Sequence, residues 1–425
     1  MTVPVPTDRA QCVALDEADP LAGFRDRFTL PKGVIYLDGN SLGALPRHTA
    51  AHVERVIRDE WGTGLIRSWN EAGWFAKPTD VGDRLAPLIG AAPGEVVIGE
   101  STSSSLFQAA AAAARLRPGR HAIVAERGNF PTDLYVLESV QTLIGPSLSG
   151  GGAPLERRLI ADDGPTLDEV LDDDVAVVVL THVDYRTGRM YDMAEVTRRV
   201  HAAGALMVWD LCHSVGAVPV DLNGAGADFA VGCTYKYVNG GPGAPSFIWV
   251  AQRHQSSVRP ALTGWHGHAR PFDFTVDYEP ADGITRFRVG TPQLLSMAGL
   301  EASLDVWADV DMAQLRAKSL QLTDLFISLV ETRLARWQLE VVTPREHERR
   351  GSQVALRFED GYAVMQALIE RGVIGDFRAP DLMRFGFAPL YVSHADVWDA
   401  VAALDEVLES RVWREPRFTQ RSAVT

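Results

Sequence analysis

The stretch 206–243, LMVWDLCHSVGAVPVDLNGAGADFAVGCTYKYVNGGPG, contains two short apolar segments that are each followed by reactive side chains. The segment LMVWD ends in Asp210, and DFAVGC leads into CTYKY, where Lys236 precedes a glycine-rich turn. Both segments are apolar throughout, which is typical of strands covered by helices on both faces. In open sheets of this kind, ligands bind beyond the carboxyl ends of the strands. The stretch therefore predicts an α/β fold with Asp210 and Lys236 at one site.

The same apolar pattern recurs upstream, in VVIG, HAIVAE and VAVVVL. Helical segments separate these strands, as in βαβ units, so the central sheet is predicted to be mainly parallel. Beyond about residue 297 the sequence has helical spacing, and from about residue 339 short strands (LEVV, QVALRF, DLMRFGFA) alternate with helices. We expect three parts: an N-terminal arm that leads into the active site (1–45), a large α/β domain (46–300), and a bridging helix with a small C-terminal α/β domain (301–425).

Composition excludes several classes of protein. The chain has 425 residues, of which 46% are hydrophobic and 23% charged, as in ordinary globular proteins. A net charge of -14 argues against nucleic acid as a partner. Three cysteines without C-x-x-C spacing predict neither a disulfide framework nor a zinc knuckle, and they favour a reducing cytoplasm. The N-terminus lacks an export signal pattern and no apolar run reaches membrane-spanning length, so neither export nor membrane insertion is expected.

Two polar stretches are expected to lie outside the packed core. SLSGGGAP (147–154) has the composition of a flexible loop. The tail RVWREPRFTQRSAVT (411–425) is basic in an acidic chain, a feature more often found in a frayed, solvated end than in a docking site.

Lys236 is the residue around which a site can be built. A lysine amine becomes a nucleophile when burial lowers its pKa, and its characteristic use is a Schiff base with a carbonyl cofactor. Taken alone, such a lysine is more often a surface residue with its amine in water. Asp210 changes that balance, because a carboxylate at a strand end can keep the pyridine nitrogen of pyridoxal phosphate (PLP) protonated. A helix N-cap is the alternative role for Asp210, and His213 in the same turn is equally explained as a core histidine.

The remaining parts of a PLP site are also present in order along the chain. GESTSSSLFQAAAAAARL follows the strand VVIG and predicts a helix N-terminus where Thr102 and Ser103 bind the cofactor phosphate. Phe130, in NFPTD after the strand HAIVAE, is placed to stack on the pyridine ring. The alternatives are an ordinary capped helix and an ordinary core aromatic residue.

The segments YLDGNSLG, GNFPTD, WDLCHSVGA, CTYKYVNGGPG, WHGH and RVGTP occur in this order, and together they resemble the kynureninase family of the PLP-dependent fold type I superfamily. The resemblance runs from about Tyr36 to Tyr391. It implies a fold with a large domain around a mainly parallel sheet and a small α/β C-terminal domain. It also implies a hydrolase that cleaves the Cβ–Cγ bond of L-kynurenine, giving anthranilate and L-alanine, in tryptophan catabolism or NAD biosynthesis.

The resemblance assigns a role to each matched residue. Lys236 would carry the Schiff base and move the proton at Cα, Tyr235 would act as an acid, and Asp210 would pair with the pyridine nitrogen. The residues implied to hold the cofactor are Thr102, Ser103, Phe130, Asp133, Thr181, Asp210, His213, Tyr235, Lys236, Trp265 and Thr291. Those implied to contact the substrate are Ser41, Trp69 and Arg384.

In the family that this chain resembles, the counterparts of Trp265 and Thr291 reach the cofactor phosphate from the partner subunit, which implies a homodimer with shared active sites. Animal-type members carry asparagine where this chain has Thr291 and histidine near Trp69. The chain is therefore similar to the kynurenine-preferring bacterial type, with 3-hydroxykynurenine as a possible second substrate.

Other functions would require residues that can be compared with those in the chain. A desulfurase of the same superfamily needs a mobile cysteine on a late loop, which none of Cys12, Cys212 and Cys233 provides. An aminotransferase-like lyase uses the same aspartate and lysine, so these residues alone do not exclude it. A non-catalytic PLP-fold regulator predicts loss of the lysine or the arginine, yet Lys236 and Arg384 are both present. A nicotinamide site would need G-x-G-x-x-G, which GESTSSS lacks, and WHGH has no third ligand at metal-binding spacing.

Overall fold

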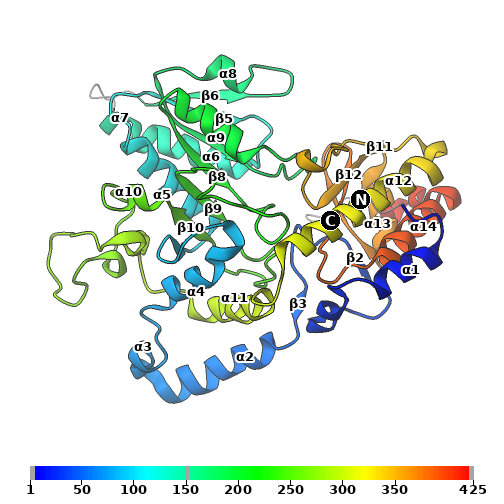
Figure 1. Cartoon of the computed structure of the whole chain (residues 1–425), viewed down its shortest axis with the longest axis horizontal. Helices are drawn as coiled ribbons and strands as arrows, with labels where there is room; N and C mark the ends of the chain where they lie inside the picture. Colours follow the sequence, from blue (N-terminus) through cyan, green and yellow to red (C-terminus); the bar gives the residue numbers. More distant parts are fainter. Residues whose placement is uncertain (1–4, 149–153, 421–425) are drawn as a thin grey trace.

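Seven strands form the central sheet of the larger half of the molecule, shown as a computed structural model in Figure 1. The structure describes residues 5–148 and 154–420. The strand order is β4-β10-β9-β8-β7-β5-β6. The strands are β4 (Val96–Ile98), β5 (Ala122–Glu126), β6 (Glu156–Ile160), β7 (Val175–Thr181), β8 (Leu206–Asp210), β9 (Phe229–Gly232) and β10 (Phe247–Val250).

The predicted mainly parallel sheet is confirmed, with one exception at β10. The pairs from β9 to β6 are parallel, whereas β10 runs antiparallel to both β4 and β9. The sequence prediction missed β10 and also β6, an edge strand whose segment ERRLI is charged and only partly buried. Edge strands lack the continuous apolar pattern because water reaches one side of them.

Helices cover both faces of this sheet. Val177 and Val179 of β7 pack in one core with α5 (Thr102–Arg115) and α6 (Pro131–Leu143), and Val178 and Leu180 pack in the core on the other face. The alanines at 109–114 are all fully buried, so α5 approaches the strands closely. The other helices of this half are α2 (Thr49–Arg55), α3 (Ser68–Glu71), α4 (Lys77–Leu85), α7 (Gly145–Leu148), α8 (Leu167–Val170), α9 (Met193–Ala202), α10 (Gln252–Gln255) and α11 (Leu294–Trp307).

The long helical segment after residue 297 is two helices rather than one bridging helix. α11 packs against α2 and α4 of the large sheet domain, whereas α12 (Met312–Arg333) packs against α14 (His394–Ser410). Asp311 caps α12, and its carboxylate accepts hydrogen bonds from the backbone N–H groups of Ala313 at 2.8 Å and Gln314 at 3.3 Å. An aspartate N-cap starts a new helix, which is why the chain turns here.

The smaller half contains a four-stranded antiparallel sheet in the order β11-β12-β15-β14. These strands are β11 (Glu340–Val341), β12 (Gln353–Arg357), β14 (Asp376–Arg378) and β15 (Leu382–Gly386), and the helices around them include α13 (Gly361–Glu370) and α15 (Pro416–Thr419). The predicted strands LEVV, QVALRF and DLMRFGFA correspond to β11, β12 and β15. β14 was not predicted, and it carries residues that matter for the site.

The N-terminal segment packs on the smaller half, where α1, drawn in dark blue, lies beside α14 in Figure 1. α1 (Arg9–Glu17) contacts α14, β1 (Phe28–Thr29) pairs with β3 (Leu45–Pro46), and β2 (Ile35–Tyr36) pairs in parallel with β13 (Val373–Ile374). A further bridge joins Asp38 to Gly386 at the end of β15. These pairings place the turn after β2 next to β14 and β15.

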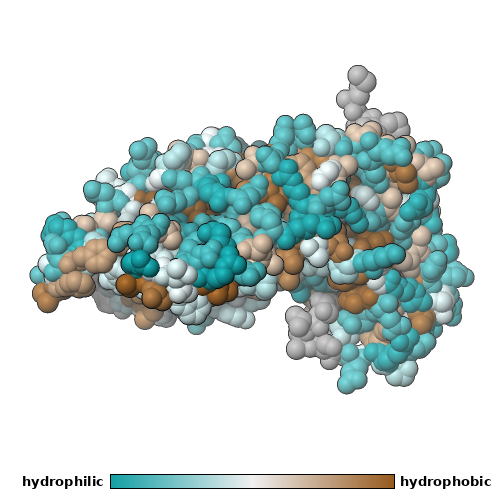
Figure 2. All heavy atoms as spheres, turned by 90° about the horizontal axis from the view of Figure 1, so that it is seen from below, coloured by the Kyte–Doolittle hydropathy of each residue, from teal (hydrophilic) through white to brown (hydrophobic). Residues whose placement is uncertain are grey.

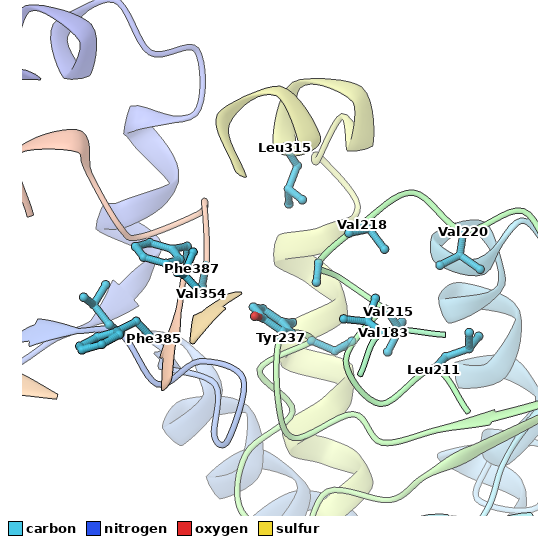
Figure 3. Close-up of a cluster of buried hydrophobic side chains, with 14 of the residues drawn as sticks. Val183, Leu211, Val215, Val218, Val220, Tyr237, Leu315, Val354, Phe385 and Phe387 are labelled. Atoms are coloured by element: carbon cyan, nitrogen blue, oxygen red, sulfur yellow. The ribbon is translucent and has the colours of Figure 1, made fainter. Parts of the chain in front are cut away.

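A cluster of buried apolar side chains joins the two halves (Figure 3). Tyr237, which follows Lys236, lies between Val215 of the large half and Phe385 of the small half. Its phenol donates a hydrogen bond of 2.9 Å to the backbone oxygen of Ser352. The loop that carries Lys236 is therefore held by the core between the two halves.

The tail differs from its prediction as a frayed end. Trp413 and Phe418 are buried in the core, with exposed fractions of 7% and 4%. Burying two aromatic side chains outweighs the solvation of the neighbouring arginines. Residues 149–153 of the predicted loop and the last five residues of the tail lie outside the described residues. Within the described ranges, no helix is long and apolar enough to cross a membrane.

Candidate active site

A cavity of about 750 Å³ opens at the carboxyl ends of the central strands. Most of the residues predicted for the site line it: Ser41, Thr102, Ser103, Phe130, Asp133, Thr181, Asp210, His213, Tyr235 and Lys236. The chain contains only the lysines Lys32, Lys77, Lys236 and Lys318, and of these Lys236 alone lines this cavity. The strand-end argument therefore located the pocket.

Lys236 contacts a neutral histidine. Its Nζ donates to Nε2 of His213 at 2.8 Å, and Nδ1 of His213 lies 3.1 Å from Oε1 of Gln353. Nε2 of Gln353 donates to the backbone oxygens of Asp184 and Tyr185, which fixes the amide so that its Oε1 accepts from His213. Burial lowers the pKa of His213 well below its usual value, and the Lys236 charge lowers it further. His213 is thus held as an acceptor toward Lys236.

Two carboxyl groups share the floor of the cavity. Asp210 is the last residue of β8, and its Oδ1 accepts a hydrogen bond of 2.7 Å from the backbone N–H of Cys212. Asp133 is hydrogen-bonded to Asp210, and burial, together with the charge of Asp210, raises the pKa of Asp133 well above its usual value. The raised pKa favours the protonated form of Asp133, which can hydrogen-bond to Asp210 instead of repelling it.

Asn129 links this pair to β7. Its Nδ2 donates to Oδ2 of Asp133 at 3.0 Å, and its Oδ1 accepts from the hydroxyl of Thr181 and from the backbone N–H of Phe130. Phe130 follows directly and stands edge-on to Tyr185, with ring centroids 5.3 Å apart. Asn129 thus orients both the acid on the floor and the aromatic residue at the wall.

An anion-binding end lies opposite Lys236, at the N-terminus of α5. Ser101 is the N-cap and forms a capping box with Ser104, so Thr102 and Ser103 are left to face the cavity. The helix dipole and the free N–H groups of the first turn favour a negative charge here. Tyr235 also lines the cavity, and burial raises the pKa of its phenol, which stays protonated.

Arg384 is the predicted residue whose environment differs most from expectation. It does not line the cavity, it is 1% exposed, and its Nε donates to Oδ1 of Asp376 at 2.8 Å. Nη2 donates to Asp376 and, at 2.9 Å, to Ser41, and Nη1 donates to the backbone oxygen of Tyr185. Ser41 and Tyr185 line the cavity, so Arg384 lies directly behind its wall.

The other three predicted residues lie together outside this cavity. The ring centroid of Trp69 is 5.9 Å from that of Trp265, and Thr291 lines a small separate pocket of about 40 Å³. Trp265 is 39% exposed, and exposed Ile66, Phe272 and Phe274 lie nearby in the chain. Hydrophobic side chains gather on the left part of the face in Figure 2, where the loop between α10 and α11 lies. In a single chain none of these three residues lines the cavity that holds Lys236.

Three residues that hold the site were missed from sequence. Gln353 and Asp376 come from β12 and β14 of the small sheet, and Asn129 precedes the predicted Phe130. Gln353 and Asp376 are far from Lys236 in sequence, and no local pattern marks them. Asn129 had a signal, because an amide directly after a strand end is as well placed as the aspartate that follows it.

The residues present fit a bound PLP. An amine, a carboxylate that stays charged, and a helix N-terminus line one cavity, which is large enough for a cofactor and a small substrate together. They match the aldehyde, the pyridine nitrogen and the phosphate of the cofactor, and Phe130 offers an aromatic face to the ring. The proton on Asp133 is consistent with this, since it leaves Asp210 as the charged partner.

Solved structures share this fold. A cysteine desulfurase from Escherichia coli matches with a TM-score of 0.75 at 20% identity, covering 92% of this chain and 98% of its own. A cysteine desulfurase from Thermococcus onnurineus matches with a TM-score of 0.74 at 18% identity, covering 96% and 99%. The cystine C-S lyase C-DES, solved with glycine covalently linked to its PLP cofactor, has a TM-score of 0.74 at 14% identity, covering 90% and 99%. At these identities the likeness shows the fold type I architecture alone.

Sequence relatives are far closer. The model of the kynureninase C-terminal domain matches residues 315–404. A kynureninase from Burkholderia pseudomallei is 56% identical over 98% of this chain and 99% of its own length. A kynureninase from Pseudomonas fluorescens is 52% identical over 99% of this chain and 100% of its own length. With relatives this similar over the full length, and with the lysine, aspartate and helix terminus in one cavity, the chain belongs to the kynureninase family.

Proposed function

We propose that this chain hydrolyses L-kynurenine to anthranilate and L-alanine, with PLP covalently attached to Lys236. The observation that carries the proposal is the single cavity in which Lys236, Asp210 and the N-terminus of α5 meet. When bound, PLP supplies an electron sink that stabilises negative charge at the substrate's Cα. Thr102, Ser103 and Tyr235 would hold its phosphate, Asp210 its pyridine nitrogen, and Phe130, Thr181 and His213 the ring and its surroundings.

The protein's own groups supply the proton transfers. Lys236 removes the proton from Cα. His213 is neutral, so it accepts a hydrogen bond from the lysine and places no second positive charge beside it. Water adds to the γ-carbonyl, the Cβ–Cγ bond breaks, and the electron pair left on Cβ takes a proton. Tyr235 is the acid we assign to this step, because its phenol is protonated and lines the cavity beside Lys236.

Arg384→Lys is expected to raise KM for L-kynurenine about 10- to 100-fold, with a smaller change in kcat. A planar guanidinium makes paired charge-assisted hydrogen bonds that an ammonium cannot reproduce. Here the exchange also breaks the fork with Asp376. Steady-state kinetics over a range of L-kynurenine concentrations measure the effect. Unchanged kinetics would assign the substrate carboxylate to another residue.

We propose that the enzyme is a homodimer in which Trp265 and Thr291 complete the partner's active site. Support comes from their position outside the cavity of their own chain and from the exposed apolar side chains around Trp265. Large exposed apolar patches mark interfaces. Trp69, which packs on Trp265, would then contact the substrate bound at the partner's Lys236. The three free, buried cysteines are consistent with a reducing cytoplasm.

Mixing two inactive variants tests this sharing of sites. Lys236→Ala and Trp265→Ala dimers should each have low activity, whereas unfolding and refolding them together in equal amounts should restore about one quarter of wild-type activity. Half of the refolded dimers contain one chain of each variant. In each of these mixed dimers one of the two sites has neither substitution, which gives one quarter of the sites intact. Mixing either variant with wild-type protein is the control for refolding yield. No recovery would place Trp265 in the same site as its own Lys236.

The fluorescence of anthranilate, released on adding L-kynurenine with and without PLP, tests the activity. We expect kcat/KM for L-kynurenine to exceed that for 3-hydroxy-L-kynurenine, since Thr291 stands where animal-type members have asparagine, and those members carry a histidine near the position of Trp69. A preference for the hydroxylated substrate would overturn the bacterial-type assignment. Either substrate arises from tryptophan breakdown, which is the pathway we propose for the enzyme.

A further inference from the structure

The substrate carboxylate would meet an arginine that already has an anionic partner. Asp376 and Arg384 are opposite one another in the β14–β15 pair, and both side chains are 1% exposed. The Nε and Nη2 edge of Arg384, the one best suited to a carboxylate, is occupied by Asp376. Arg384 and Asp376 together carry no net charge. Arg384 alone is therefore a weak attractor for an anionic substrate.

A second arginine adjoins the same carboxylate. Arg378 lies two positions beyond Asp376 on β14, and its Nη2 is 2.7 Å from Oδ2 of Asp376 and 3.4 Å from Oγ of Ser41. Its side chain is 32% exposed, so it is the more accessible of the two guanidinium groups. Its Nε is buried and has no hydrogen-bond partner among the described residues. Arg378 thus has a donor without a partner and, like Arg384, lies behind the cavity wall, against the Ser41 hydroxyl that lines the cavity.

The protonation state of Asp38 sets the net charge of the cluster formed by Arg378, Arg384, Asp376 and Asp38. It lies in the turn after β2, bridged to Gly386, and its Oδ1 is buried without a hydrogen-bond partner in the described part of the chain. Burial raises the pKa of Asp38 to about 7, and the charge of Asp376 contributes. With Asp38 protonated, two arginines and Asp376 sum to one positive charge. With Asp38 ionised, the sum is zero.

We propose that Arg378 and Arg384 together bind the α-carboxylate of the amino-acid substrate, and that protonated Asp38 is what leaves this two-arginine site with its positive charge. The identity of the substrate rests on the proposed function, whereas the charge balance does not. Ser41 is the shared contact, since its Oγ accepts from both arginines, lies 2.7 Å from Asp376 and faces the cavity. Asp376 is a positioning residue that holds both guanidinium groups.

Asp38 is the group here that changes charge near neutral pH. The titratable and charged groups that interact with it come from five segments: Tyr36 of β2, Asp376 and Arg378 of β14, Arg384 of β15, and Tyr237 and Tyr391 of two adjoining loops. Burial raises the pKa of all three tyrosines, so they stay neutral. Burial raises the pKa of Asp376, but the charges of Arg384 and Arg378 and the hydrogen bonds from Arg384 and Ser41 together outweigh it, so the pKa lies below its usual value and Asp376 stays ionised. Carboxylate binding should then weaken as pH rises through neutrality.

Calorimetric titration of the PLP-loaded protein with L-alanine and with L-alaninamide tests the proposal, because the amide lacks only the carboxylate. Between about pH 6 and about pH 8 the Kd for alanine should rise about tenfold in wild type, and Asp38→Asn should remove this rise. Asparagine resembles the protonated acid in shape and charge. The same pH dependence in Asp38→Asn as in wild type would overturn the role of Asp38.

Arg378→Met should weaken alanine binding at least about tenfold at about pH 6 and alaninamide binding by less than about twofold. Arg378→Lys, which keeps the charge, should recover part of the loss, and it replaces the methionine variant if that fails to fold. Arg357→Met, which removes a surface ion pair with Glu340, is the matched control. Equal losses for alanine and its amide would contradict the role of Arg378. These titrations involve no kynurenine, so they can succeed where kynurenine cleavage fails, and the reverse.

Discussion

Lys236→Ala is expected to abolish the release of anthranilate, lowering kcat by at least about 10³-fold. In the proposed function the amine is both the attachment point for PLP and the base at Cα, and loss of a single general base alone costs about 10²- to 10⁴-fold. His213 is a poor replacement base although its Nε2 adjoins the amine, since burial holds its pKa well below the usual value. Rates are measured from anthranilate fluorescence with PLP in excess.

The same variant locates the covalent bond. Borohydride should fix PLP to wild type at a single peptide and fix none to Lys236→Ala. The chain makes this test sharp, because Lys32, Lys77 and Lys318 are its only other lysines. Lys32→Ala is the matched control, since that lysine is exposed and outside the cavity, and it should label like wild type. Label on any other lysine would remove the central assignment.

Asp210→Asn is expected to lower kcat by about 10³-fold, because an amide cannot keep the pyridine nitrogen protonated and the electron sink weakens. Asp133→Asn is the informative comparison and should cost less than about tenfold. Burial and the charge of Asp210 raise the pKa of Asp133 and so favour its protonated form, and asparagine preserves that neutral hydrogen-bonding group. Asp133→Asn leaves the carboxylate of Asp210 in place, whereas Asp210→Asn removes it.

Kinetics and the absorption spectrum of bound PLP distinguish these outcomes. Asp210→Asn should also shift the cofactor's absorption, since the protonation state of its ring changes. Equal losses in the two variants would mean that the charge is shared between the carboxyl groups. A larger loss in Asp133→Asn would exchange the roles that burial and hydrogen bonding assign to them.

Sequence patterns located the strand ends well, because burial on both faces leaves a strong local signal. Asp210 and Thr181 each end an apolar strand, Phe130 and Lys236 each come shortly after one, and the sheet brings all four to one edge. The same reasoning missed β10, although its segment FIWV is fully buried, and it gave no sign that this strand reverses direction. Strand direction depends on connections across the sheet and not on the residues of the strand.

Residues from the small half could not be predicted, because their contacts depend on how the two halves pack. Gln353 reaches His213 only because the core around Tyr237 joins the halves. Arg384 was expected to offer a free fork to the substrate, and the structure shows the fork held by Asp376 on a strand that no pattern marked. The predicted residue was near the right place, and its chemistry depends on a cross-strand neighbour.

The most direct measurement is product analysis after L-kynurenine is added to the purified, PLP-loaded protein. We expect anthranilate and L-alanine in equal amounts, with formation of both dependent on PLP and absent in Lys236→Ala. A folded, PLP-loaded protein that consumes L-kynurenine without releasing anthranilate, or does not consume it at all, would contradict the proposed hydrolysis.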